Sequence, residues 1–261
     1  MKLPHRLAAV AEFIPQGKVV ADIGSDHGYL PVYLAKKGIS PLTIATEVSY
    51  ASLQKVRSLS EKHEVENLVL LRQGDGLFAL EKGDAPEVLV VAGMGGHSIV
   101  QILQQNQQNC PGADRMVLQP MRDDQFLRYW LLDHGFCITG EKLSYEKGRF
   151  YIVMSLSPGV QLFADPIAME VGPLLLERGD PLLPAYLRHK INYYKMIMDK
   201  LSNKVGEKSK EQFSVLKDKV DRLEEVLSVV DQGKKGGGTD RTVSSSLSGR
   251  GRRSSRFAGW L

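Results

Sequence analysis

The chain has 261 residues, of which 43% are hydrophobic, so it is long and apolar enough for one or two domains with a buried core. These values exclude a peptide, a fibre and a wholly disordered protein. The longest apolar run, near residues 88–92, is far shorter than the roughly 18 residues of a membrane span, and residues 1–15 lack the pattern of a secretory signal. Two cysteines, Cys110 and Cys137, are too few for a disulfide framework or a zinc site. We therefore expect a cytoplasmic protein with no membrane partner and no bound metal.

The net charge of +4 is unevenly distributed. Residues 1–183 contain 17 Lys and Arg against 21 Asp and Glu, whereas residues 184–261 contain 17 against 9. Clustered Lys and Arg gain free energy by releasing counterions from phosphates. The division indicates an acidic part with a small-molecule site and a basic part that meets a polyanion. A solvated charged surface is the alternative.

Five short apolar, β-rich runs are separated by intervals that suit helices. They are residues 19–23, 43–47, 68–71, 88–92 and 116–119. Such runs predict a parallel sheet covered by helices on both faces. The next two extended stretches, 136–145 and 149–156, are joined by Glu-Lys-Gly and predict a hairpin that adds an antiparallel pair to the sheet.

The basic part has the apolar spacing of two heptad helices. The first run is Leu187, Ile191, Tyr194, Met198, Leu201 and Val205, and the second is Phe213, Leu216, Val220, Leu223, Leu227 and Val230. A short break at 206–209 predicts that the helices fold back on each other as an antiparallel coiled coil. The apolar face of one helix could instead pair with a second chain to form a dimer, but the short connection favours a monomer. Residues 232–261 are rich in Gly, Ser and Arg and predict a disordered tail.

Residues 21–31, Ala-Asp-Ile-Gly-Ser-Asp-His-Gly-Tyr-Leu-Pro, follow the first predicted strand and have the character of a cofactor loop. Gly24 and Gly28 allow a sharp turn and a close approach to a ligand. The glycine spacing is neither that of a dinucleotide site nor that of a phosphate cradle. Asp22 and Asp26 would repel a pyrophosphate but suit a cofactor with positive charge, such as S-adenosyl-L-methionine.

Acidic residues also stand at the ends of the next two strands. Glu47 is placed to accept hydrogen bonds from ribose hydroxyls, and Asp75, between Gly74 and Gly76, from an adenine amino group. The fourth strand runs into a Gly-rich segment, residues 92–96, that leaves room beside a methyl group. Three acids at successive strand ends favour one shared site over helix caps or surface charges.

These motifs resemble the bacterial TrmK family, which methylates N1 of the adenosine at position 22 of tRNA. The resemblance covers about residues 1–230 and is carried by the loop above and by Gly74-Asp-Gly-Leu77, Ala92-Gly-Met-Gly-Gly96, Leu118-Gln-Pro120, Leu127-Arg-Tyr-Trp-Leu131 and Glu141. It implies an α/β fold: a class I (Rossmann-like) methyltransferase domain with a C-terminal α-helical antiparallel coiled-coil domain. It also implies S-adenosyl-L-methionine as cofactor and tRNA as partner. The chain departs from the family pattern at residues 49–52, where a Gly-Pro pair is common, and at Met121, where an Asn is common.

The expected site has three groups of residues. The expected cofactor-binding residues are Asp22, Gly24, Ser25, Asp26, His27, Glu47, Val48, Gly74, Asp75, Gly76, Ala92, Gly93 and Met94. Asp26, His27 and Tyr29 are the expected catalytic residues: Asp26 accepts from the exocyclic amine, His27 orients the cofactor or base, and Tyr29 stacks on a base removed from its helix. The expected RNA-binding residues are Arg6, Gly95, Gly96, Gln119, Pro120, Lys190, Lys195 and Lys204. Core packing for Met94 and Tyr29, and a surface role for Arg6, are the alternatives.

We expect four segments in the chain. Residues 1–160 form the methyltransferase domain, 161–183 a connecting segment, 184–231 the tRNA-binding coiled coil and 232–261 the tail. Two other functions stay open at this point. One is a class I methyltransferase for another RNA or a small molecule, and the other is a non-catalytic module that binds S-adenosyl-L-methionine or RNA.

Overall fold

The computed structural model describes residues 1–105, 113–163, 165–202 and 206–235. Cys110, Lys204, Val205 and the predicted tail from residue 236 onward lie outside these ranges. The chain divides into two compact units, the first comprising Met1–Leu162 and the second beginning at Phe163. Within the described ranges, no helix is both long and apolar enough to cross a membrane.

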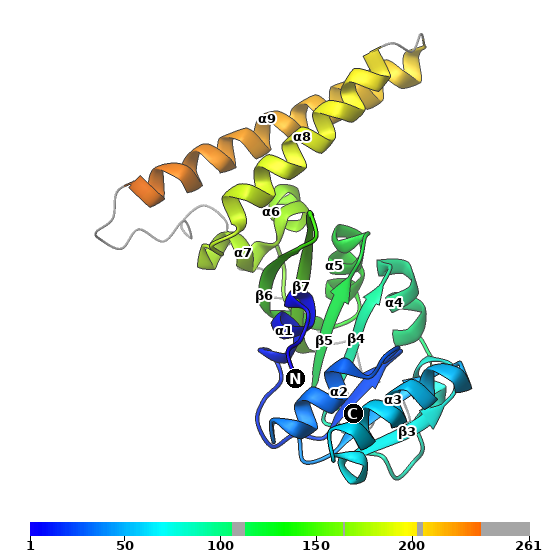
Figure 1. The fold of residues 1–261 in the computed structure, drawn as a ribbon. Coiled ribbons are helices and arrows are strands. Elements are labelled where there is room, and N and C mark those ends of the chain that lie inside the picture. The colour runs from blue at the N-terminus through cyan, green and yellow to red at the C-terminus, as the bar shows by residue number, and fades with distance from the viewer. Residues whose placement is uncertain (106–112, 164, 203–205, 236–261) are drawn as a thin grey trace. The chain divides into compact units, whose positions relative to one another are not determined.

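The first unit is built on a single seven-stranded sheet (Figure 1). Its strands are β1 (Val20–Ile23), β2 (Thr43–Glu47), β3 (Val69–Gln73), β4 (Val88–Met94), β5 (Arg115–Pro120), β6 (Phe136–Glu146) and β7 (Arg149–Pro158). Their order is β3-β2-β1-β4-β5-β7-β6. The first five strands are parallel, and the β6–β7 hairpin joins β5 through an antiparallel pairing with β7. The predicted α/β fold is confirmed.

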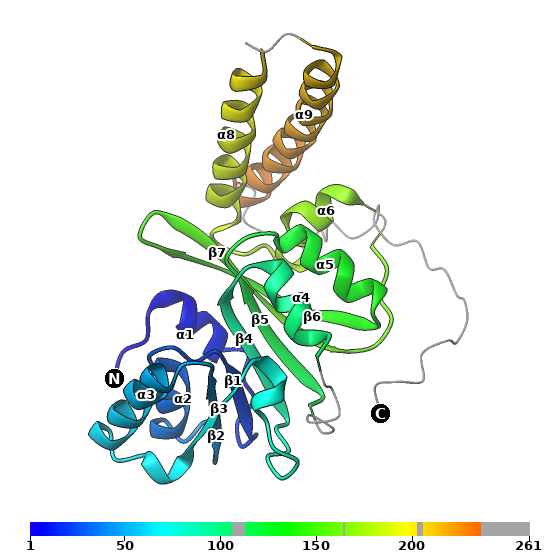
Figure 2. The ribbon, with the colours of Figure 1, turned by 90° about the vertical axis from the view of Figure 1, so that its right-hand side faces the viewer.

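Helices cover both faces of this sheet (Figures 1 and 2). On one face lie α1 (His5–Ala11), α2 (Tyr29–Lys36) and α3 (Tyr50–Lys62), and on the other lie α4 (Gly96–Leu103) and α5 (Asp124–Asp133). Two 3₁₀ helices, η1 (Glu66–Leu68) and η2 (Gly76–Ala79), flank β3. The side chain of Ser49 caps α3 by accepting from the amide of Ser52, so this helix begins without the Gly-Pro pair of the family.

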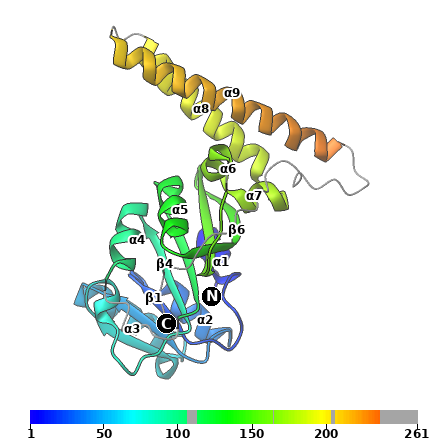
Figure 3. The same ribbon diagram turned by 180° about the vertical axis from the view of Figure 1, so that it is seen from behind.

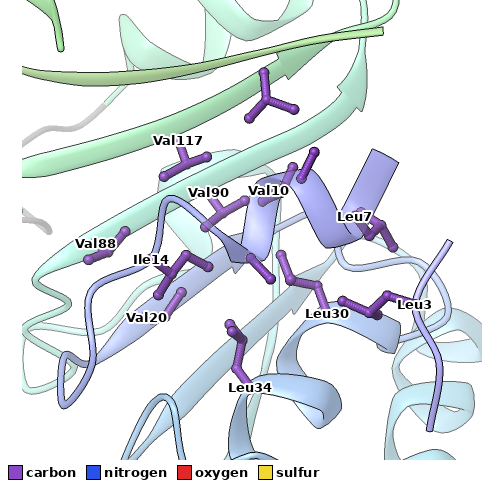
Figure 4. Close-up of a cluster of buried hydrophobic side chains, with 13 residues drawn as sticks. Leu3, Leu7, Val10, Ile14, Val20, Leu30, Leu34, Val88, Val90 and Val117 are labelled. Carbon is purple, nitrogen blue, oxygen red and sulfur yellow. The ribbon is translucent and has the colours of Figure 1, made fainter. Parts of the chain in front are cut away.

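The core between the sheet and its first helical layer is continuous (Figure 4). Leu30 and Leu34 of α2 and Val10 of α1 lie against valines of the central strands, among them Val20 and Val90. All five side chains are at most 2% exposed. Burying each such side chain contributes about 1.5–3 kcal/mol to stability. Because helices cover both faces of the sheet, the strands carry apolar side chains on both faces.

A buried ion pair connects α5 with β6. Arg128 is fully buried, and its Nε donates to Glu141 Oε1 at 2.7 Å while its Nη1 donates to Asp124 Oδ2 at 2.8 Å. Such a pair is stable only when the charges are well aligned and hydrogen-bonded. Arg128, in the motif of residues 127–131, and Glu141 are therefore partners in one buried structural ion pair.

The second unit is helical and contains α6 (Pro166–Val171), α7 (Pro173–Arg178), α8 (Leu183–Ser202) and α9 (Glu207–Lys235). The stretch predicted as a connecting segment thus includes two short helices. The break predicted at residues 206–209 also differs, because α9 already begins at Glu207. At its other end, α9 continues past the limit predicted at residue 231.

Figure 3 shows α8 and α9 side by side, and the contacts between them fix their direction. Arg188 near the start of α8 pairs with Asp231 near the end of α9, and Lys195 pairs with Glu224, both at 2.6 Å. This register is that of antiparallel helices. Apolar residues of both heptad runs are buried there, namely Leu187, Ile191, Val220 and Leu223. The predicted helix pair is confirmed.

A buried carboxylate holds α6 to both long helices. Glu170 of α6 is 3% exposed and pairs with Lys190 Nζ at 2.6 Å and Lys219 Nζ at 2.9 Å, and it accepts from the Tyr194 hydroxyl at 2.5 Å. Burial raises the pKa of Glu170, but the two lysines and Tyr194 outweigh that effect, and the pKa is lowered overall. Lys190, predicted to contact RNA, is therefore committed to this cluster, its side chain only 13% exposed.

Candidate active site

The strand order places a crevice at the carboxyl edge of the sheet. The chain leaves β1 on one side and β4 on the other, and the two strands are neighbours in the sheet. In open α/β sheets, ligands bind at such a topological switch point. A cavity of about 530 Å³ lies here, between the ends of β1, β2 and β4 and the segment that follows β3.

The loop between β1 and α2 forms one wall of this cavity. It turns through three residues in the left-handed region, Gly24 (φ 76°), Asp26 (φ 49°) and Gly28 (φ 72°). A Cβ on Gly28 would also lie 2.7 Å from Val56 Cγ1 of α3. Glycine is therefore required there both by the left-handed backbone and by the close contact. The loop is held to β2, because Asp26 N donates to Glu47 Oε1 at 2.5 Å and Gly24 N donates to Thr46 Oγ1 at 3.3 Å.

Asp22, the acid before this loop, is only 5% exposed. Burial raises the pKa of its carboxyl to about 7, and the nearby Glu47 adds to the increase, while Ser25 and Arg6 oppose it. A cationic group in the cavity would favour the ionised form. Asp22 thus provides a carboxylate whose negative charge a cationic ligand would stabilise further.

The opposite wall is formed by the turn after β3. A Cβ on Gly74 would lie 2.8 Å from Ala79 Cα, so this glycine lets the turn close against η2. Gly76 has φ 56°, and the following amide, Leu77 N, donates to Gln105 Oε1 at 2.9 Å. Asp75 stands between the two glycines with its side chain exposed at the cavity.

The floor is the end of β4, where the pairing with β5 shifts register between Ala92 and Met94. Gly93, in the middle of this bulge, has φ 86°. A Cβ there would lie 3.5 Å from the Arg6 Nη1 atom, which shows that the guanidinium extends over the bulge. Arg6 Nη1 also donates to Gln119 Oε1 at 3.2 Å, so it is held in place from beneath.

The three residues expected to be catalytic lie together at the mouth of the cavity. The side chain of Asp26 is 70% exposed, and its Oδ2 is 3.6 Å from His27 Nε2. The rings of His27 and Tyr29 are 5.7 Å apart, and Tyr29 is exposed rather than packed in the core. The three side chains can therefore reach a substrate that enters from solvent.

All of the residues predicted to bind the cofactor line the cavity, as do Arg6 and Tyr29. Four residues of the first unit that are predicted to contact RNA do not line it. Gln119 and Pro120 are buried beneath the site, and Gly95 and Gly96 form the start of α4. A Cβ on Gly96 would lie 2.6 Å from the Asp123 carbonyl oxygen, so this glycine is explained by packing.

The structure adds lining residues that are not among the predicted site residues. They are Leu7, Ile23, Leu30, Thr46, Ser98, Gln101, Ile102 and Gln105. Ser98, Gln101, Ile102 and Gln105 recur at three- and four-residue intervals along and just beyond α4. This spacing is the signal that could have identified them, because it places them on one side of a helix that begins at the cavity.

The donors and acceptors of the cavity fit S-adenosyl-L-methionine. The cavity lining includes the carboxylates of Asp22, Glu47 and Asp75, which can accept hydrogen bonds from ammonium, ribose hydroxyl and adenine amino groups, and the left-handed glycines leave space for close approach. The buried Asp22 would gain from a cationic partner, and the amino acid end of this molecule carries an ammonium group.

Comparison with known proteins agrees with this geometry. The family model of TrmK, tRNA (adenine(22)-N(1))-methyltransferase, matches residues 20–225. The tRNA (adenine(22)-N(1))-methyltransferase of Bacillus subtilis is 32% identical over 238 residues, which are 89% of this chain and 99% of that protein.

Two solved structures have the same fold over most of the chain. The B. subtilis m1A22 tRNA methyltransferase TrmK is 31% identical with a TM-score of 0.75, covering 87% of this chain and 99% of that one. Sp1610 of Streptococcus pneumoniae, in complex with S-adenosyl-L-methionine, is 31% identical with a TM-score of 0.77, covering 87% and 100%. With the family model matching most of its length, this chain belongs to the TrmK family of S-adenosyl-L-methionine-dependent tRNA (adenine(22)-N(1))-methyltransferases.

Proposed function

We propose that the cavity at the carboxyl edge of the sheet is the site at which this chain methylates N1 of adenosine 22 in tRNA. The observation that carries the proposal is the set of carboxylates at successive strand ends, Asp22, Glu47 and Asp75, around one cavity. Membership of the TrmK family supplies the substrate and the position of the methyl group.

Each carboxylate has a separate task in holding the cofactor. Asp22 pairs with the ammonium of the amino acid end, and its burial makes this pairing strong. Glu47 accepts from the ribose hydroxyls while it also anchors the amide of Asp26. Asp75 accepts from the adenine amino group, and Met94 contacts the cofactor from the floor.

S-adenosyl-L-methionine supplies an electrophilic methyl group when it is bound. Adenine N1 has a lone pair in the plane of its ring and needs no prior deprotonation, so the protein has to align the base rather than provide a strong base. The ring becomes positively charged as N1 forms its new bond to the methyl carbon and the bond from that carbon to sulfur breaks, leaving the electron pair on sulfur. A nearby hydrogen-bond acceptor for the exocyclic amine stabilises that charge.

Asp26 provides this acceptor, and its strained backbone and exposed carboxylate support the assignment. Tyr29 offers a ring face on which the adenine can stack after it leaves its pair, since N1 lies on the pairing edge. His27 lies between the two and orients either the base or the cofactor. Arg6, over Gly93, contacts a phosphate or closes the site.

Residues 1–160 are the catalytic domain in this proposal, and residues 184–231 bind tRNA by charge and shape. Lys195 supports this assignment because its side chain is half exposed, although it also pairs with Glu224. Lys190 is excluded from direct RNA contact by its burial against Glu170. That the chain acts as a monomer stays a prediction.

The test is methyl transfer from labelled S-adenosyl-L-methionine to unmodified tRNA transcripts, with the product mapped as a block to reverse transcription. We expect a stop at adenosine 22 that disappears when this base is replaced by guanosine. Asp26→Asn should lower kcat at least tenfold with little change in cofactor affinity, whereas Asp133→Asn, exposed and outside the cavity, tests for general effects of losing a carboxylate.

The other outcomes decide between the open alternatives. Transfer to a different nucleotide would contradict the position and favour another RNA substrate. Cofactor binding without transfer to any transcript would contradict catalysis and favour a binding module.

A further inference from the structure

A second, shallower groove adjoins the mouth of the cavity. It has a volume of about 450 Å³ and lies between the cofactor loop and α3. It is lined by His27, Tyr29, Ala51, Gln54, Lys55, Ser58, Leu59 and Lys62. His27 and Tyr29 line both the groove and the cavity, so a substrate that reaches the methyl-transfer site can continue directly into the groove.

One face of α3 makes up most of the groove wall. Lys55, Leu59 and Lys62 are spaced by four and three residues, which places them on the same side of the helix. The opposite side of α3 packs into the core through Leu53, Val56 and Ser60. The two lysines are about 10 Å apart along the helix axis, so they are suited to different groups of an extended ligand rather than to a single small ion.

Among the described residues, the charged side chains that line the groove are those of two lysines, and no carboxylate lines it. Within the described part of the chain, Lys55 and Lys62 form no ion pair. At the end of α3, Lys36 Nζ is 3.1 Å from His63 Nδ1. Burial lowers the pKa of His63 first, and the charges of Lys36, the N-terminal amine and Lys62 lower it further. Positive charge therefore accumulates along this side of the molecule.

We propose that this groove binds the sugar-phosphate backbone of the RNA strand adjoining the methylated nucleotide, with Lys55 and Lys62 contacting successive phosphates. The inference rests on the proposed function, because a base exposed at N1 must leave its pair and carry its own strand to the mouth of the cavity. An unpaired strand there meets Tyr29 through its bases and the α3 lysines through its phosphates. The combination of an aromatic face with a basic groove is typical of single-strand binding.

The test compares two double variants with the same change in charge. Lys55→Glu/Lys62→Glu alters the groove, and Arg57→Glu/Lys82→Glu alters exposed positions outside it, the first on the same helix. The dissociation constant for a tRNA transcript is measured at several salt concentrations, together with cofactor affinity and thermal stability. Lys55→Gln/Lys62→Gln provides a milder form of the groove variant should the charge reversal prevent folding.

We expect the groove variant to bind tRNA about tenfold more weakly and to lose about two units of the slope of log affinity against log salt, since each phosphate contact contributes roughly one. Cofactor affinity stays unchanged, and the control variant stays within about twofold of wild type in tRNA affinity. Equal weakening by both variants, or none by the groove variant, would overturn the proposal.

Chemical labelling of lysines tests the same proposal in the wild-type protein, without a substitution. Acylation of Lys55 and Lys62 in the wild-type protein should fall when tRNA is present, while that of Lys82 should not. If tRNA does not reduce the acylation of Lys55 and Lys62 in a protein that methylates its tRNA, the groove proposal is wrong and the proposed function stands. A wild-type protein that neither binds nor methylates tRNA would refute the proposed function, and with it the groove.

Discussion

Replacement of Asp22 by Asn should make the cofactor-free protein more stable and at the same time weaken cofactor binding. The carboxyl of Asp22 is buried, and its pKa is raised from the model-compound value of 3.8 to about 7. The folded state thus holds the Asp22 proton more tightly than the unfolded state does. As the pH rises from 4 to 7, the unfolded chain releases this proton first, and the free energy of unfolding falls.

The magnitude follows from the size of the shift. Each unit of pKa corresponds to about 1.4 kcal/mol, so a shift from 3.8 to about 7 removes about 4 kcal/mol of stability above pH 7. The Asn variant carries no such charge. We therefore expect equal pH dependence below pH 4 and a widening advantage of the variant up to pH 7, where its melting temperature should be about 10 °C higher.

Cofactor binding should narrow this difference in stability between the variant and the wild type. The ionised carboxylate of the wild type gains a cationic partner, and at a ligand concentration of about 100 Kd binding adds about 2.7 kcal/mol to the free energy of unfolding. The variant lacks the charge and should bind at least tenfold more weakly. Wild-type affinity should also decrease as the pH falls below 7, because protonated Asp22 does not attract the ammonium.

The assay is chemical denaturation between pH 4 and pH 8, with calorimetric titration of S-adenosyl-L-methionine at each pH. Asp75→Asn is the matched control, since it removes an exposed carboxylate from the same cavity without a burial effect. If the difference in unfolding free energy between wild type and Asp22→Asn does not change with pH, the buried-charge argument is wrong. Unchanged cofactor affinity in this variant would contradict the assigned role.

Three further predictions concern the framework of the site. Arg128→Met should destabilise the protein by about 3–5 kcal/mol in urea unfolding, because it leaves Glu141 buried without its guanidinium, and adding Glu141→Leu should recover part of the loss. Gly96→Ala should lower the unfolding free energy by about 1–3 kcal/mol, since the new Cβ meets a backbone oxygen. Gly95→Ala meets only an exposed arginine side chain and should have a small effect; equal losses in the two glycine variants would contradict the packing argument. Glu170→Gln should destabilise the helical unit by about 3 kcal/mol near pH 7 and much less at acidic pH, where the wild-type carboxylate is protonated; circular dichroism melts that show no pH dependence would be inconsistent with its lowered pKa.

The sequence predicted the parts of this protein that depend on local pattern. Continuous apolar runs define strands that are buried on both faces, and each of the seven strands lies within a few residues of its prediction. The cofactor loop was recognisable because Gly24 and Gly28 adopt left-handed backbone conformations that other residues rarely take. Heptad spacing likewise predicted α8 and α9, although their ends differ from the predicted boundaries.

Contacts between distant parts of the chain could not be predicted in this way. Arg6 bonds to Gln119 and lies over Gly93, and neither contact leaves a periodic trace in the sequence. Gln119 is predicted to contact RNA because it belongs to a motif that resembles the family pattern, but its side chain is buried and does not line the cavity. Lys190 is predicted to contact RNA because of its charge, but its ammonium pairs with the buried carboxylate of Glu170.

The sequence by itself determined the fold class, the cofactor loop and the three acids of the site, because strand ends and glycine turns are encoded by residues close together in the chain. The tertiary structure alone decided which charges are buried, which are paired and which face solvent. The pKa of Asp22 near 7 and the groove beside the lysines of α3 depend on side chains brought together from separate elements. Electrostatic free energy depends on burial and on distance in space, and neither quantity can be read from position along the chain.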